Sequence, residues 1–331
     1  MPSLKEIAAS KGLLYGTAIN AGHVVGTKSA QTAMAELVRR ECACITAESD
    51  MKWTAIRPEA AKFDFTRADK LAQFASDNGL LLRGHALVWH DLPAWAQNIS
   101  AQDAETILVE HMKATASRYE GKVGHWDVIN EVASPNGLRD TIWLRHLGEK
   151  YIDLAFEVAK ECCTATRFYN ENRMEYDNWE MENKRKSVLK LLERLVSSGV
   201  PIEGLGIQAH LFPELPFSES KYSAFLRDVG ALGLKILITE CDVTDRELPG
   251  DVAKRDQMVA DTFKKFLNVA LAEPAVIGVL TWGLTDTYSW INSVRPRPDG
   301  LPCRPLHFDD QLKPKPAYQA IYDAIANAPA R

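Results

Sequence analysis

The chain has 331 residues, of which 46% are hydrophobic and 25% are charged, and its net charge at pH 7 is −5. This composition is ordinary for a globular protein with a large core, and the acidic balance gives no reason to expect nucleic acid or an anionic membrane as a partner. No apolar run approaches the roughly 18 residues that span a bilayer. Residues 1–11 are polar and mixed in charge, so they do not predict a signal peptide.

The cysteines indicate neither a metal site nor a disulfide framework. They are Cys42, Cys44, Cys162, Cys163, Cys241 and Cys303. Cys42 and Cys44 are too close in sequence for an easy mutual bond, and the adjacent Cys162 and Cys163 could bridge only with strain. The chain has no paired C-x-x-C motif and no histidine spacing typical of zinc ligands. We therefore expect no metal and mostly free, buried thiols, with one disulfide still open.

Short apolar stretches typical of β-strands alternate along the chain with stretches of helical periodicity. Strands are predicted at 13–19, 44–49, 80–87, 123–130, 167–170, 204–210, 235–241 and 276–283. Helices are predicted at 30–40, 67–78, 103–119, 141–161, 178–198, 218–232, 252–271 and 317–326. Eight strands that alternate with eight helices favour an α/β fold of the (β/α)₈ barrel type over an open, doubly wound sheet.

Domain organisation follows from the absence of a linker. The length would allow two domains, but no stretch rich in Gly, Ser or Pro divides the chain, and no segment is of low complexity. The prolines of residues 294–305 predict a long loop after the eighth strand. We therefore predict a single domain over residues 1–331, with the barrel itself at about 12–327.

Polar residues are concentrated where the predicted strands end. In chain order they include Glu48, Ser49, Lys52, His85, Trp89, Asn130, Glu131, Tyr169, Asn170, Gln208, His210, Glu240, Trp282 and Trp290. Taken singly, a histidine is more often a satisfied core residue, a tryptophan a packing residue and a lysine a solvated charge. In a parallel barrel, however, the carboxyl ends of all strands meet at one mouth, and catalytic residues come from several of them.

Two of these residues, Glu131 and Glu240, each end a strongly apolar strand. One such glutamate would more often form a salt bridge, but two at the same mouth suggest paired carboxylates. Glycoside hydrolysis requires such a pair, because one group protonates the leaving oxygen and the other attacks or activates water. Aromatic rings stack on sugar faces, and polar side chains bind hydroxyls. The rim therefore predicts a carbohydrate site.

Eight motifs carry a resemblance to a known family. They are YGTAI at 15–19, ESDMKW at 48–53, RGHALVWH at 83–90, WDVINE at 126–131, GIQAH at 206–210, ITECD at 238–242, TWGLTD at 281–286 and KPKPAY at 313–318. Each motif alone is weak, but their order and spacing are specific. Over nearly its whole length the chain resembles glycoside hydrolase family 10, the endo-β-1,4-xylanases.

The resemblance implies a retaining double displacement with Glu131 as general acid/base and Glu240 as nucleophile, without metal or organic cofactor. In the retaining geometry the two carboxyl groups lie about 5–5.5 Å apart. Asn130 would hold the 2-hydroxyl of the sugar that is cleaved, and His210 with Gln208 would orient Glu240.

The resemblance also assigns the remaining rim residues. Glu48, Lys52, His85 and Trp89 would line the glycone side, with Ser49 at the second glycone subsite. Trp282 would form part of the floor at the cleavage point, and Trp290 would lie over the nearby rim. The implied partners are xylan and xylo-oligosaccharides, with no protein partner, and secretion or export to the periplasm is implied.

Three departures from the family pattern concern the subsites. Ser49 stands where the family usually has Asn, and Asp91-Leu92-Pro93 is one residue shorter than the common Ser-Gln-x-Pro. Asn172 replaces a tyrosine that would stack with the aglycone, and Tyr176 is the nearest aromatic that could take its place. We therefore expect weaker binding of xylobiose on the glycone side than is usual for the family.

The sequence leaves other functions open. A barrel of the same fold could prefer short xylo-oligosaccharides, aryl xylosides or another β-1,4-glycan, or could bind polysaccharide without catalysis. Retention of Glu131, Glu240, Asn130 and His210 argues against a non-catalytic barrel. A nicotinamide or phosphate-binding enzyme is disfavoured, since residues 20–23 after the first strand do not fit G-x-G-x-x-G.

Overall fold

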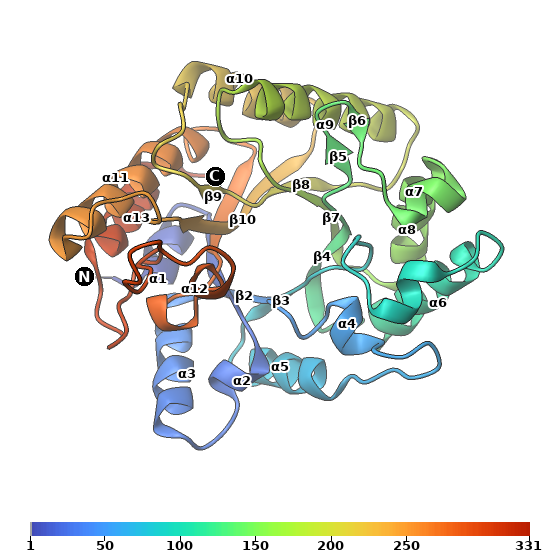
Figure 1. The fold of residues 1–331 in the computed structure, drawn as a ribbon, viewed down its shortest axis with the longest axis horizontal. Coiled ribbons are helices and arrows are strands. Elements are labelled where there is room, and N and C mark those ends of the chain that lie inside the picture. Colours follow the sequence, from blue (N-terminus) through green and yellow to red (C-terminus); the bar gives the residue numbers. More distant parts are fainter. Residues whose placement is uncertain (1) are drawn as a thin grey trace.

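The computed structural model describes residues 2–331, so Met1 of the predicted domain lies outside it, and it shows a closed barrel of parallel strands surrounded by helices (Figure 1). The barrel strands are β1 (Leu14–Ile19), β2 (Cys44–Ala47), β3 (Leu81–Gly84), β4 (Val123–Asn130), β7 (Thr166–Glu171), β8 (Gly204–Ile207), β10 (Lys235–Val243) and β11 (Val276–Thr281). Strand β11 pairs with both β10 and β1, and this closes the sheet. The predicted (β/α)₈ barrel in a single domain is confirmed.

The helices between the strands also agree with the prediction, with one exception. They are α3 (Ser29–Glu41), α5 (Thr66–Asp77), α6 (Ala104–Arg118), α7 (Ile142–Leu147), α8 (Lys150–Cys162), α9 (Trp179–Ser197), α10 (Glu219–Ala231), α11 (Val252–Ala270) and α13 (Pro316–Asn327). The stretch predicted as one helix at 141–161 is two helices, because Gly148 adopts a left-handed φ of 66° and ends α7.

Short elements complete the rim and the base. They are α1 (Leu4–Ser10), α2 (Ala21–Val24), α4 (Trp53–Ile56), η1 (Ala94–Asn98), the hairpin β5 (Ala133–Ser134) and β6 (Gly137–Leu138), β9 (His210–Leu211), η2 (Asp286–Tyr288) and α12 (Ile291–Val294). Helix α1 was not predicted, since its seven residues are too few to show periodicity, although a capping box between Ser3 and Glu6 begins it.

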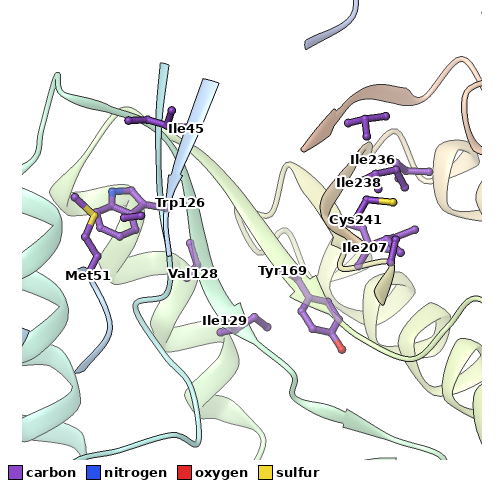
Figure 2. Packing of buried hydrophobic residues seen from close by; sticks show 14 of the residues in the cluster. Ile45, Met51, Trp126, Val128, Ile129, Tyr169, Ile207, Ile236, Ile238 and Cys241 are labelled. Carbon is purple, nitrogen blue, oxygen red and sulfur yellow. The ribbon is translucent and has the colours of Figure 1, made fainter. Parts of the chain in front are cut away.

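The main core lies between the barrel strands and the helices. Trp126, Val128 and Ile129 of β4 are fully buried in it, and Figure 2 shows Met51 beside Trp126. Ile236 and Ile238 of β10 belong to this core, whereas Leu237 between them belongs to a separate cluster, as the period of two in a strand requires. The outward faces of the strands thus pack against the helices, and the inward faces fill the barrel interior.

Inside the barrel, the side chains change from apolar to polar toward the carboxyl ends of the strands. Cys44, Phe168, Leu237 and Leu280 form a small, fully buried apolar cluster. Further along four strands lie the buried Arg83, Asp127, Asn170 and Thr239. The Arg83 guanidinium stacks 4.6 Å from the Phe168 ring centroid and pairs with Asp127. This buried polar layer supports the residues at the mouth.

The long segment after β11 is held by buried ion pairs. Lys315 Nζ donates to Asp286 Oδ2 at 2.9 Å, and Arg304 donates to both oxygens of Asp256 at 2.7 Å. Residues 295–305 contain no helix or strand, as the prolines predicted. These contacts fix the segment that carries Trp290 over the mouth.

Two further observations concern the described part of the chain. All six cysteines are free thiols, and five of them are buried while Cys162 is half-buried. Within residues 2–331, no helix has both the length and the apolar character needed to cross a membrane.

Candidate active site

A cleft of about 490 Å³ opens at the carboxyl ends of the barrel strands. Ten of the twelve predicted site residues line it, namely Lys52, His85, Trp89, Asn130, Glu131, Gln208, His210, Glu240, Trp282 and Trp290. They come from six different strand ends, and the parallel barrel brings them together. Glu48 and Ser49 are not part of the lining.

Backbone strain is concentrated at this mouth. Glu131, Arg173 and Ala209 have φ values of 56°, 55° and 60°, in the left-handed region that non-glycine residues avoid. Each lies just after β4, β7 or β8. Such conformations are costly and are found mainly at functional sites, where the surrounding structure maintains them. The strain therefore points to the same rim as the polar residues.

Glu240 is buried and held by two donors. Its Oε1 accepts from Asn170 Nδ2 at 2.7 Å, and its Oε2 lies 3.2 Å from His210 Nε2. Burial raises the pKa of Glu240, but the hydrogen bond from His210 and the charges of His85 and His210 outweigh it, so the pKa is lowered overall. Glu240 is therefore ionised at neutral pH.

His210 is fixed between two carboxylates. Its Nδ1 lies 2.8 Å from Asp242 Oδ1, and Asp242 Oδ2 accepts from Trp290 Nε1 at 2.7 Å. Burial lowers the pKa of His210, but Asp242 and Glu240 more than offset burial and raise it to about 10. The imidazolium therefore donates from both nitrogens and stabilises the charge on Glu240.

Glu131 has a different environment, with 12% of its side chain exposed. Its Oε1 accepts from Gln208 Nε2 at 3.0 Å, while Oε2 lies 3.7 Å from Arg139 and 3.9 Å from His90 Nε2. One carboxyl oxygen is thus fixed by an amide, and the other is open toward the cleft. The two glutamates are therefore chemically distinct, which allows them different roles.

Asn130 lies between the two glutamates. Its amide contacts Asn170 Nδ2 at 3.0 Å and Gln208 Nε2 at 3.3 Å. With its oxygen turned the other way, it accepts from Trp89 Nε1 at 3.0 Å. The groups that hold Glu131 and Glu240 are therefore joined in one buried network.

The half of the cleft that follows β2 and β3 is aromatic and cationic. The His85 ring lies 5.3 Å from the Trp282 ring, and His85 Nδ1 lies 2.9 Å from Asp127 Oδ2. Lys52 Nζ lies 4.9 Å from the centroid of the Trp89 ring. This half therefore offers ring faces and donors side by side, as a sugar requires.

Glu48 lies beside this half, in a neighbouring recess with His23 and Tyr288. Its Oε2 accepts from Asn20 Nδ2 at 2.9 Å and lies 3.9 Å from His23 Nδ1. Ser49 follows it and is half-buried. The structure thus separates these two residues from the ten that line the cleft.

The family profile described as glycosyl hydrolase family 10 matches residues 3–324. The chain belongs to this glycosyl hydrolase family. The endo-1,4-beta-xylanase B of Thermotoga neapolitana is 35% identical over 298 residues, which cover 88% of this chain and 82% of the relative. The endo-1,4-beta-xylanase A of Fusarium oxysporum is 33% identical, with 87% and 88% covered.

Solved structures of family 10 agree with the barrel described above. A crystal structure of xylanase 10B from Thermotoga petrophila in complex with xylobiose has a TM-score of 0.89 and 32% identity, with 98% of this chain and 97% of that chain covered. Native xylanase 10B from Thermotoga maritima has a TM-score of 0.88 and 33% identity, with 98% of both chains covered.

Two residues that support Glu240 were not among the predicted site residues of this family 10 hydrolase. Asn170 contacts Glu240 directly, and Asp242 contacts it through His210. Asp242 follows Glu240 by two positions in β10, so strand alternation would have placed both on one face. Asn170 was noted at the end of its strand but given no role. The position of each residue at a strand end could have placed it at the rim. Its contacts could not be predicted, because its partners come from other strands.

Tyr176 does not replace the missing aglycone aromatic, so that suggestion is wrong. It is only 4% exposed, and its hydroxyl accepts from Phe212 N at 2.6 Å. The loop between β7 and α9 folds Tyr176 inward against Phe212 and Phe217. Phe212 itself lines the cleft instead.

Proposed function

We propose that this protein is a retaining endo-1,4-β-xylanase that hydrolyses internal bonds of xylan. The observation that carries the proposal is the pair of unlike glutamates in one cleft, with Glu240 ionised between His210 and Asn170 and Glu131 open to the cleft. Relatives named endo-1,4-beta-xylanases and a neighbour in complex with xylobiose support xylan as the substrate.

In the first step, protonated Glu131 gives its proton to the glycosidic oxygen while Glu240 attacks the anomeric carbon. The bond to the leaving sugar breaks, and an ester between Glu240 and the glycone forms. In the second step, Glu131 takes a proton from water, and the resulting hydroxide displaces Glu240. Two inversions restore the β-configuration. Part of the proposal is a carboxyl separation of about 5–5.5 Å, typical of retaining enzymes.

The other cleft residues bind the sugar chain in this proposal. Lys52, His85, Trp89 and Trp282 hold the glycone, and Asn130 binds the 2-hydroxyl of the sugar that is cleaved. Gln208 positions Glu131, and His210 positions Glu240. Trp290 covers the rim through its bond to Asp242. Glu48 and Ser49 would contact a glycone sugar further from the bond that breaks.

The proposed reaction also has consequences for the domain organisation and the cellular location of the protein. Residues 1–331 would act as one catalytic domain, and no step needs a metal or organic cofactor. Because xylan is a large polymer outside the cell, we infer that the enzyme is secreted or periplasmic. Weaker binding of xylobiose on the glycone side remains a prediction.

The test is hydrolysis of xylan with the anomer of the product followed by NMR. We expect oligosaccharides rather than xylose as first products, with the β-anomer appearing first. Glu240→Ala should lose activity, whereas the exposed Glu157→Ala on α8 should keep it. An α-anomer appearing first would refute retention, and faster hydrolysis of β-1,4-glucan would favour the rival substrate.

Glu131→Ala separates the two proposed roles. It should lose activity on xylan but retain formation of the glycosyl ester from an aryl xyloside, because a good leaving group needs no proton. If Glu131→Ala lost both activities equally while remaining folded, the assignment of Glu131 as acid would be wrong.

A further inference from the structure

The end of the cleft opposite Lys52 and Trp89 is built differently from the glycone half. Asn172 and Arg173 follow β7, Phe212 and Glu214 follow β9, and Arg295 follows α12. In the order of strands around the barrel, β8 lies across from β2, and β10, which pairs with β9, lies across from β3. With the glycone assigned to Lys52, His85 and Trp89, this end holds the leaving part of the chain.

Arg295 is a cation held in place without a carboxylate partner. Its Cζ lies 5.0 Å from the centroid of the Phe212 ring, and the residue is exposed. Within residues 2–331, no carboxylate oxygen lies within 4.0 Å of its guanidinium nitrogens. Stacking on an aromatic ring orders a guanidinium while its N–H groups stay free to donate.

Other arginines near the cleft are already engaged. Arg297 donates to the carbonyl oxygen of Leu248 at 2.8 Å and pairs with Asp299 at 2.6 Å. Arg173 pairs with Glu180 at 2.9 Å, but both side chains are about half exposed, so this pair can exchange for a better one. Among these three arginines, all within residues 2–331, Arg295 is thus the one whose donors are free.

We propose that Arg295, assisted by Arg173, binds the carboxylate of a uronic acid substituent on the leaving side of the sugar chain. The proposal rests on the function proposed above. An unsubstituted xylan backbone is neutral and offers a guanidinium no charged partner. A carboxylate can accept two parallel N–H bonds from one guanidinium, which is stronger than a bond to a hydroxyl. The enzyme therefore prefers acidic xylan.

Negative charges restrict where such a substituent binds. Glu240 and Asp242 line the centre of the cleft and repel a carboxylate there. Glu214 is exposed at the same end as Arg295 and opposes binding as well. The substituent is therefore directed to the outer edge, on the first or second sugar beyond the bond that breaks.

The test compares two substrates that differ only in charge. One is xylan with uronic acid substituents, and the other is the same material after reduction of each carboxyl to a hydroxymethyl group. Wild type should cleave the acidic form with a kcat/KM about two- to fivefold higher, the range for an exposed ion pair. The preference should fall in 0.5 M salt because exposed charges are screened.

Single substitutions test which residues cause the preference for acidic xylan. Arg295→Gln should reduce the ratio of the two rates to about one, and Glu214→Gln should increase it. Arg227→Gln, which removes an exposed arginine on α10, should leave both rates unchanged. Acidic products should carry the substituent on the first or second sugar from the newly formed non-reducing end.

The outcomes separate this inference from the proposed function. Equal rates on both substrates in wild type, or a ratio that Arg295→Gln leaves intact, would overturn the inference while the xylanase activity stands. An equal loss of kcat/KM on both substrates in Arg295→Gln would show instead that Arg295 acts by packing against Phe212, and it would overturn the inference. No hydrolysis of either substrate by wild type would refute the proposed function itself.

Discussion

The pKa of Glu240 should depend on Asn170, which contacts the Glu240 carboxylate directly. Asn170 is fully buried, and its Nδ2 donates to Glu240 Oε1 at 2.7 Å. A donor stabilises the ionised carboxylate, so its removal in Asn170→Ala should raise the pKa of Glu240. The nucleophile would then need a higher pH to become ionised.

The magnitude follows from the strength of the bond. A hydrogen bond to a charged group contributes about 1.5–3 kcal/mol, and one pKa unit corresponds to about 1.4 kcal/mol. The full effect would be one to two units. His210 also lowers the pKa of Glu240 and remains in the variant. We therefore expect a rise of about one unit.

The assay is the pH dependence of kcat/KM for an aryl xylobioside with a good leaving group. Its acid limb reports the nucleophile of the free enzyme, because such a leaving group needs no proton from Glu131. The limb should move to higher pH by about one unit in Asn170→Ala. An acid limb that stays in place, or moves to lower pH, would refute the reasoning.

A milder variant tests how Asn170 is oriented. Thr239 Oγ1 donates to Asn170 Oδ1 at 2.7 Å and so keeps Nδ2 turned toward Glu240. Thr239→Val has nearly the same shape but lacks this donor, so it should shift the limb in the same direction by less. Thr281→Val is the matched control, since the Thr281 hydroxyl donates to Thr17 instead.

Four other perturbations follow from the structure. Gly84→Ala places a Cβ 2.1 Å from the buried Trp126 ring and should lower the unfolding free energy by about 1–3 kcal/mol in urea titrations; an unchanged midpoint would contradict this. Lys315→Met leaves the buried Asp286 and Asp256 without their lysine and should cost about 3–5 kcal/mol by the same measurement, and a gain in stability would show that the ion pairs are dispensable. The pKa of His210 is raised from 6.5 to about 10 in the folded state, so its contribution to stability is complete below pH 6.5 and is lost as pH rises through 10. The difference in unfolding free energy between wild type and His210→Asn should therefore shrink from pH 6.5 to 10. A difference that grows over this range would have the wrong sign. Ser49→Asn should lower KM for xylotriose, and an unchanged KM would remove Ser49 from the glycone subsite.

The fold and most of the cleft could be predicted from the amino-acid sequence alone. The alternation of apolar strands with periodic helices is a local signal, and eight such units favour a parallel barrel, in which all carboxyl ends lie at one mouth. Glu131, Glu240 and His210 could therefore be placed at one rim from their positions alone. The division of helix 141–161 at Gly148 was missed, because a single glycine in a periodic stretch is a weak signal.

Which rim residues touch one another could be seen only in the folded chain. The network of Asn170 with Glu240 joins strands 70 residues apart, and the contact of Arg295 with Phe212 joins two loops of irregular conformation. The same is true of Glu48, which turns to Asn20 beside the cleft. Loop conformations depend on packing and on ion pairs such as Lys315 with Asp286. No local pattern encodes them, so the position of Arg295 at the leaving end became visible only in the folded chain.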